Sequence, residues 1–155
     1  MINKVVKLYV RRGRRLALWT KAGVGTEFWA ENWGRTSENE LRYALRPTKS
    51  LGFHTLFFRR WLPRKGIILE ASCGEALWVS RLSLNGWKCI GLDKAGETLS
   101  RSKRIRPDLT LVKGDVLSLP FPDASLAGYL SLGVMEHFEA GLGPPLKECY
   151  RVLRK

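Results

Sequence analysis

Two acidic residues, each at the end of an apolar run, are the first sign of a ligand-binding site. Glu70 follows the apolar residues that begin at Ile67, and Asp93 closes a second run, KCIGLD, 23 residues further on. Small residues at 72–74 follow Glu70, and such a turn lets backbone N–H groups approach a ligand closely. An acid about 20 residues beyond this kind of turn can accept hydrogen bonds from ribose hydroxyls. The spacing predicts a nucleoside-binding site.

The same residues argue against a dinucleotide as the ligand. Positions 72, 74 and 77 are Ser, Gly and Leu, so the Gly-x-Gly-x-x-Gly fingerprint is missing. The carboxylate of Glu70 beside the turn would also repel a pyrophosphate. A nucleoside that carries positive charge fits an acid-lined site better, and S-adenosylmethionine (SAM), with its ammonium and sulfonium groups, is such a ligand.

The chain after residue 66 has the pattern of an α/β fold. We expect strands at 67–71, 88–93, 109–113 and 126–131, and helices over about 75–84, from 94 to about 103, and from about 145 to the end. Alternating strands and helices predict a Rossmann-like parallel sheet with flanking helices, here in the strand order three, two, one, four. Ligands bind beyond the carboxyl ends of such strands. Asp115 and Leu132-Gly133 follow the third and fourth strands and should join the site.

The N-terminal part of the chain differs in charge. Residues 1–65 hold 15 of the 27 Lys and Arg residues but only 4 of the 14 Asp and Glu residues. We therefore divide the chain into a basic helical extension, 1–65, and a SAM-binding Rossmann-like domain, 66–155. Residues 3–20 suggest a basic amphipathic helix interrupted near Gly13. Further short helices are expected around Trp29 and Trp33, after the capping-box pair Ser37 and Glu40, and over 51–62.

The ordered motifs of residues 66–155 resemble class I SAM-dependent methyltransferases, and most closely the type 11 family. The stretches concerned are ILEASCGEA at 68–76, GLDKAGETL at 91–99, KGDVLSLPFPDASL at 113–126, YLSLGVMEHF at 129–138 and LKECYRVLRK at 146–155. The resemblance implies an enzyme that transfers a methyl group from SAM to a small-molecule or glycan-type acceptor. The sequence does not identify that acceptor.

The resemblance also implies roles for individual residues. Glu70, Ser72 and Gly74 would shape the methionine end of the cofactor pocket, and Asp93, with Lys94 after it, would bind the ribose. Asp115 would accept from the adenine amino group beside the Val116 N–H, while Leu132 and Gly133 would lie near the sulfonium. His137 is a candidate base. No metal ligands are expected, because Cys73, Cys89, Cys149 and the two histidines lack metal-site spacing.

Two departures from the family pattern have consequences. Ser72 and Ala76 replace the first and third glycines of the turn, and Ser72 adds a side chain where the cofactor comes closest. Family members also continue through further strands beyond the position of Lys155. We therefore expect a C-terminally truncated sequence whose strand 126–131 is an open edge that invites self-association.

Each assigned residue also has a plainer interpretation. Glu70 and Asp93 could cap the helices that follow them, Asp115 could be a turn residue, and His137 could be structural. Cys73 is expected to pack rather than react. The aromatic residues of 28–61 are expected to form core or lid.

A second function remains open alongside the enzyme. The chain could be a non-catalytic or truncated SAM-binding module whose basic arm, residues 1–65, docks on RNA or on an anionic membrane surface. Without a long apolar run or a signal-peptide core, the sequence predicts a cytoplasmic protein that is at most peripheral to a membrane.

Overall fold

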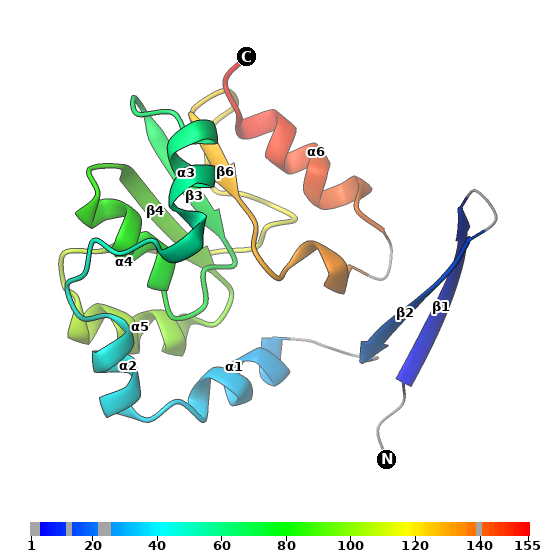
Figure 1. The fold of residues 1–155 in the computed structure, drawn as a ribbon, viewed down its shortest axis with the longest axis horizontal. Helices are drawn as coiled ribbons and strands as arrows, with labels where there is room; N and C mark the ends of the chain where they lie inside the picture. The colour runs from blue at the N-terminus through cyan, green and yellow to red at the C-terminus, as the bar shows by residue number, and fades with distance from the viewer. Residues whose placement is uncertain (1–3, 12–13, 22–25, 139–140) are drawn as a thin grey trace.

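A four-stranded parallel sheet forms the centre of the molecule (Figure 1). This computed structural model describes residues 4–11, 14–21, 26–138 and 141–155. The strands are β3 (Ile67–Ala71), β4 (Lys88–Asp93), β5 (Thr110–Lys113) and β6 (Gly128–Leu130). Their order is β5-β4-β3-β6, and each neighbouring pair is parallel. The predicted fold class and strand order are confirmed.

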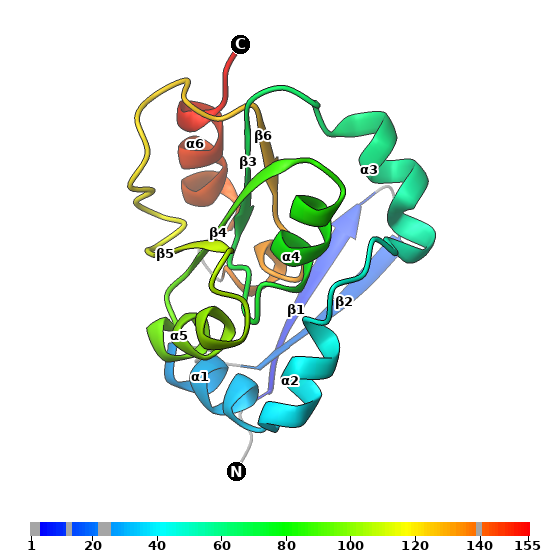
Figure 2. The same cartoon turned by 90° about the vertical axis from the view of Figure 1, so that its left-hand side faces the viewer.

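Helices cover both faces of this sheet (Figure 2). One face carries α3 (Thr55–Trp61), α4 (Leu77–Leu84) and α5 (Gly96–Ile105), and the other carries α6 (Gly143–Val152). Two short 3-10 helices, η1 (Gly52–His54) and η2 (Met135–His137), precede α3 and follow β6. Within the described residues, none of the helices has the length and apolar character needed to cross a membrane.

The core divides into two layers because successive strand residues point to opposite faces. On β3, Ile68 packs in a cluster with Phe58 of α3 and Val79 of α4. The next residue, Leu69, packs in a second cluster with Val152 of α6. Both faces of β3 are therefore buried, as is typical of a central parallel strand.

The first part of the chain forms a hairpin, so the predicted helix over residues 3–20 was wrong. Strands β1 (Lys4–Arg11) and β2 (Arg14–Lys21) pair antiparallel, with Lys4 opposite Lys21 and Arg11 opposite Arg14. The two segments are rich in β-branched and aromatic residues, which favour extended backbone: Val5, Val6, Tyr9, Val10, Trp19 and Thr20. Their apolar spacing also lacks a regular helical period.

The other helices predicted before residue 65 are present. Helix α1 (Thr26–Gly34) is the short helix expected around Trp29 and Trp33. Helix α2 (Glu38–Ala44) begins with the predicted capping box, in which the Glu40 N–H donates to Ser37 Oγ and the Ser37 N–H donates to the Glu40 carboxylate. The expected segment 51–62 divides into η1 and α3.

Residues on both sides of position 65 share one hydrophobic core. Leu51, Phe58 and Leu62 pack in the same cluster as Ile68 and the buried residues of α4. The Arg106 guanidinium, at the end of α5, donates to the Leu45 carbonyl at 3.2 Å and to Ser80 Oγ at 2.7 Å. The domain boundary at residue 65 stays a prediction. Because one core cluster contains residues from both sides of it, the boundary can be tested with a core substitution before residue 65.

Strand β6 forms one edge of the sheet. Next to it, Leu126 pairs with Leu153 through a parallel bridge, in which the Leu126 N–H donates to the Val152 carbonyl and the Arg154 N–H donates to the Leu126 carbonyl. The end of α6 therefore leads into a segment that runs beside residue 126. The predicted edge strand, 126–131, is therefore hydrogen-bonded to this segment at its first residue, Leu126.

Candidate functional site

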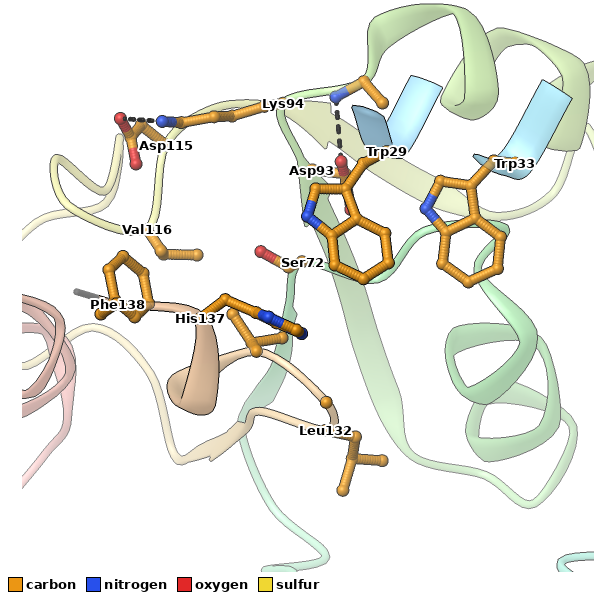
Figure 3. A pocket seen from close by; sticks show the side chains of 13 residues that line it. Trp29, Trp33, Ser72, Asp93, Lys94, Asp115, Val116, Leu132, His137 and Phe138 are labelled. Carbon is orange, nitrogen blue, oxygen red and sulfur yellow. Dashed lines mark hydrogen bonds and ion pairs between the residues drawn. The ribbon is translucent and has the colours of Figure 1, made fainter. Parts of the chain in front are cut away.

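A cavity of about 250 Å³ opens beyond the carboxyl ends of the parallel strands (Figure 3). Each strand of the sheet leads into a loop that contributes to it. Its walls are formed by Trp29, Trp33, Ser72, Asp93, Lys94, Ala95, Asp115, Val116, Leu132, Gly133, Val134, His137 and Phe138. The position agrees with the rule that open α/β sheets bind ligands at this end.

The turn between β3 and α4 has an unusual backbone. Ser72, Gly74 and Ala76 have positive φ angles of 58°, 50° and 61°, a region that glycine adopts far more readily than other residues. These three positions are those at which the resemblance expects glycines. Ser72 and Ala76 therefore hold strained conformations at the edge of the cavity.

Asp93 ends β4 and organises the loops around it. The Gly74 N–H donates to Asp93 Oδ2 at 2.8 Å, and the Ala95 N–H donates to Oδ1 at 2.9 Å. The residue is almost fully buried, yet it lines the cavity. Asp93 thus stabilises the turn after β3 and the start of α5 while facing the ligand space.

A second acid in the cavity wall, Asp115, is paired with a lysine. Lys94 Nζ is 2.7 Å from Asp115 Oδ2, and the Leu117 N–H donates to Asp115 Oδ1 at 2.9 Å. Both charged side chains are partly exposed to solvent. The ion pair spans the loops after β4 and β5 (Figure 3).

Glu70 lies under the site rather than in its wall. The Val79 N–H donates to Glu70 Oε2 at 2.9 Å, so the carboxyl group supports the first turn of α4. Burial raises the pKa of Glu70 to about 8, against the opposing effect of the Val79 hydrogen bond and with a smaller contribution from Asp93. The structure therefore separates Glu70 from the cavity that its sequence position suggested it would line.

Aromatic side chains from α1 form another part of the cavity wall. The rings of Trp29 and Trp33 stack with centroids 6.1 Å apart, and the His137 ring meets Trp29 edge-on at 5.1 Å. A Cβ placed on Gly74 would lie 2.8 Å from Trp33 Cζ2, so the indole lies directly against this glycine. The Arg101 guanidinium holds the end of α1 by donating to the Trp33 carbonyl at 2.9 Å and to the Thr36 carbonyl.

The structure brings most of the predicted cofactor residues together. Glu70 and Gly74 are the two that do not line the cavity, and Gly74 is in contact with its wall through Trp33. His137 lines it as well. Sequence reasoning missed Ala95, Val134 and Phe138, which are apolar or small residues inside the motifs but were assigned no role. Trp29 and Trp33 were expected to belong to the core or to a lid, and that expectation did not specify that they line the cavity.

Cys73 is a packing residue in this arrangement. It is buried, and a Cβ added to Gly91 of β4 would lie 2.7 Å from its sulfur. Burial, with the nearby acids Glu70 and Asp93 adding to it, raises the pKa of the Cys73 thiol far above its usual range. A thiol held neutral in this way is a poor nucleophile.

Comparison with known families agrees with this geometry. A family model described as a methyltransferase domain, type 11, matches residues 69–155, which contain the turn after β3 and both cavity acids. The chain belongs to the type 11 class I SAM-dependent methyltransferases. S-adenosylmethionine is the cofactor of these methyltransferases.

Individual relatives of this methyltransferase domain point the same way. A Mycolicibacterium smegmatis protein named "Probable S-adenosylmethionine-dependent methyltransferase" is 33% identical over 89 residues, which are 56% of this chain and 34% of that protein. A Mycobacterium tuberculosis protein of the same description is 28% identical over 105 residues, 65% of this chain and 37% of its own. The chain thus spans about a third of the length of these curated relatives.

Solved structures share the fold of the methyltransferase domain. A Pyrococcus horikoshii protein superposes with a TM-score of 0.64 at 20% identity, covering 83% of this chain and 61% of its own. A SAM-dependent methyltransferase from Archaeoglobus fulgidus gives a TM-score of 0.55, also at 20% identity, over 83% and 53%. At this level of identity the likeness concerns the fold alone.

Proposed function

We propose that this methyltransferase domain binds SAM in the cavity beyond the sheet and that the protein methylates a small-molecule or glycan-type acceptor. The observation that carries the proposal is the meeting of Asp93 and Asp115 in one cavity with Val116 and Leu132. Carboxylates there suit the hydroxyl and amino donors of a nucleoside, and the apolar residues suit its base. The acceptor class rests on the family resemblance.

The residues present fit this cofactor. Each carboxylate oxygen has two lone-pair sites. One site on each Asp93 oxygen accepts from a backbone N–H, which leaves capacity for ribose hydroxyls. Asp115 likewise retains acceptor capacity beside Lys94 and the Leu117 N–H, since its side chain is about one-third exposed. The carboxylates also favour a ligand of positive charge.

The chain's own contribution would be positioning and exclusion of water. When bound, SAM supplies an activated methyl group on a cationic sulfonium, so an oriented acceptor is the main requirement. Trp29 and Trp33 would cover the cavity from the α1 side and keep water from the reacting groups. His137, on the same wall, would accept a proton from an acceptor whose hydroxyl or amino group must lose one.

Calorimetry on the 155-residue chain tests cofactor binding without requiring activity. We expect SAM and its demethylated product to bind and NAD to bind far more weakly. Asp93→Ala should weaken SAM binding by about 1–3 kcal/mol, because ribose hydroxyls lose an acceptor. Since Asp93 also supports two loops, Asp115→Ala provides a second variant, and Asp123→Ala, whose partner is Arg151, serves as the control.

Each outcome of this experiment separates the hypotheses. Preference for NAD, or no binding of SAM by a folded chain, would contradict the proposal. Binding of SAM without methyl transfer to any small-molecule or glycan acceptor tested would favour the non-catalytic binding module instead.

A further inference from the structure

Helix α3 turns an apolar face toward solvent. Leu56, Phe57 and Trp61 are 81%, 52% and 68% exposed, although their helix is only seven residues long. Successive helical residues are about 100° apart, so these three side chains and Arg60 occupy one continuous arc. Scattered exposed apolar residues are ordinary, but three large ones on one short helix form a patch.

The opposite side of α3 fixes this orientation. Phe58 is fully buried, and its ring contacts those of His54, at 5.7 Å, and Trp78, at 5.2 Å, which also contact each other. Leu62, one turn later, is buried in the same cluster. Because Phe58 and Leu62 anchor the helix to α4 and the sheet, rotation cannot bring Leu56 inward without exposing them.

Positive charge surrounds the patch. Residues 41–69 contain seven Lys and Arg residues and not one Asp or Glu. Arg59, Arg60, Arg64 and Lys65 are all exposed on or just after α3. The Arg60 guanidinium lies 5.5 Å from the Trp61 ring centroid, so a cation and an aromatic ring are presented together.

We propose that this face of α3 docks on an anionic lipid surface. Leu56, Phe57 and Trp61 would enter the boundary between headgroups and acyl chains, while Arg59 and Arg60 pair with lipid phosphates. RNA is the weaker match, because the most exposed side chain, Leu56, offers no ring on which a base could stack. No residue of α3 lines the cavity, so the inference is independent of the proposed methyl transfer.

Vesicle flotation with the 155-residue chain tests the inference. Binding is measured to vesicles of phosphatidylcholine alone and to vesicles that contain one-third phosphatidylglycerol, at low and at high salt. One variant, Leu56→Ser with Trp61→Ser, removes the apolar contact, and another, Arg59→Gln with Arg60→Gln, removes charge. The control is Leu146→Ser with Tyr150→Ser, whose side chains are 49% and 71% exposed on α6, the helix on the opposite face of the sheet (Figure 2).

We expect at least tenfold stronger binding to the anionic vesicles, loss of that preference at high salt, and an at least tenfold loss in both α3 variants. The α6 variant should bind as the parent does. Every altered side chain is at the surface, and far-UV circular dichroism checks that each variant is folded.

Three results would overturn the inference. The first is equal binding to neutral and anionic vesicles, or no binding to either. The second is unchanged binding in both α3 variants. The third is a single-stranded RNA oligonucleotide that binds more tightly than the vesicles and displaces the protein from them.

Discussion

Replacing Ser72 with glycine should make the protein more stable, although it removes a side chain. Ser72 has a φ of 58°, where a residue with a Cβ pays about 1–2 kcal/mol relative to glycine. Glycine loses part of this advantage, about 0.4–1 kcal/mol, because it is more flexible in the unfolded chain. The difference between the midpoints of these two ranges is a net gain of about 0.8 kcal/mol for Ser72→Gly.

Ala76 provides an internal comparison for this prediction. Its φ of 61° is equally unfavourable, but its side chain is fully buried. Removing a buried methyl group costs about 0.8 kcal/mol. Ala76→Gly should therefore change the free energy of unfolding by close to zero, whereas Ser72→Gly, at a partly exposed position, keeps its gain.

Urea unfolding followed by circular dichroism measures both effects, with the slope of free energy against urea as a check on two-state behaviour. Ser72→Ala retains the Cβ and should match the parent within about 0.5 kcal/mol. If Ser72→Gly were no more stable than Ser72→Ala at an unchanged slope, the strain argument would be refuted. Because Ser72 lines the cavity, SAM binding by Ser72→Gly should be at least as tight as in the parent.

Three other substitutions test the packing and electrostatics around the site. Gly74→Ala should cost about 2 kcal/mol of stability, because Gly74 has a positive φ and an added Cβ would clash with Trp33. Combining it with Trp33→Ala should remove the clash but not the backbone strain, and a double-mutant cycle would measure the part recovered. Burial raises the pKa of Glu70 to about 8 from an ordinary 4.5, so the protonated carboxyl stabilises the fold fully below about pH 4.5 and this contribution is lost as the pH rises toward 8. Glu70→Gln should therefore gain stability over the parent between pH 5 and pH 8, by about 2 kcal/mol or more in urea unfolding, and a constant difference would contradict the burial argument. Phe58→Ala should destabilise the whole sheet domain by about 3–5 kcal/mol, although Phe58 lies before residue 65. As a control, the substitution Leu56→Ala at an exposed position should change stability by less than about 0.5 kcal/mol. A small effect of Phe58→Ala in thermal unfolding would favour independent domains.

The sheet was predictable because its strands are short apolar runs followed by small or acidic residues. Because β3 is buried on both faces, its residues Ile67–Ala71 are mostly apolar. Such a run can be recognised in the sequence without knowing which strands lie beside it. Helix starts were less accurate. Helix α4 was expected from about residue 75 but begins at Leu77, because the turn before it holds positive φ through Ala76.

The parts that sequence could not provide depend on contacts between distant segments. Trp33 meets Gly74 through the packing of α1 beside α5, and no local pattern encodes that pairing. Glu70 and Asp93 looked alike as strand-end acids, yet one supports α4 from below and the other faces the cavity. The register of the sheet decides this, because Glu70 lies opposite Gly91 and Asp93 therefore lies two residues further toward the carboxyl ends of the strands.

The central position of β3 also has a consequence for the order in which the protein folds as it is synthesised. Its pairing with β4 joins residues about twenty apart, but its pairing with β6 waits for a segment roughly 60 residues later, as in Ile68 opposite Gly128. Until the ribosome has released that segment, one edge of the most apolar strand has no partner. A nascent chain that ends near residue 115 should therefore engage chaperones, and the engagement should cease once residue 130 has emerged.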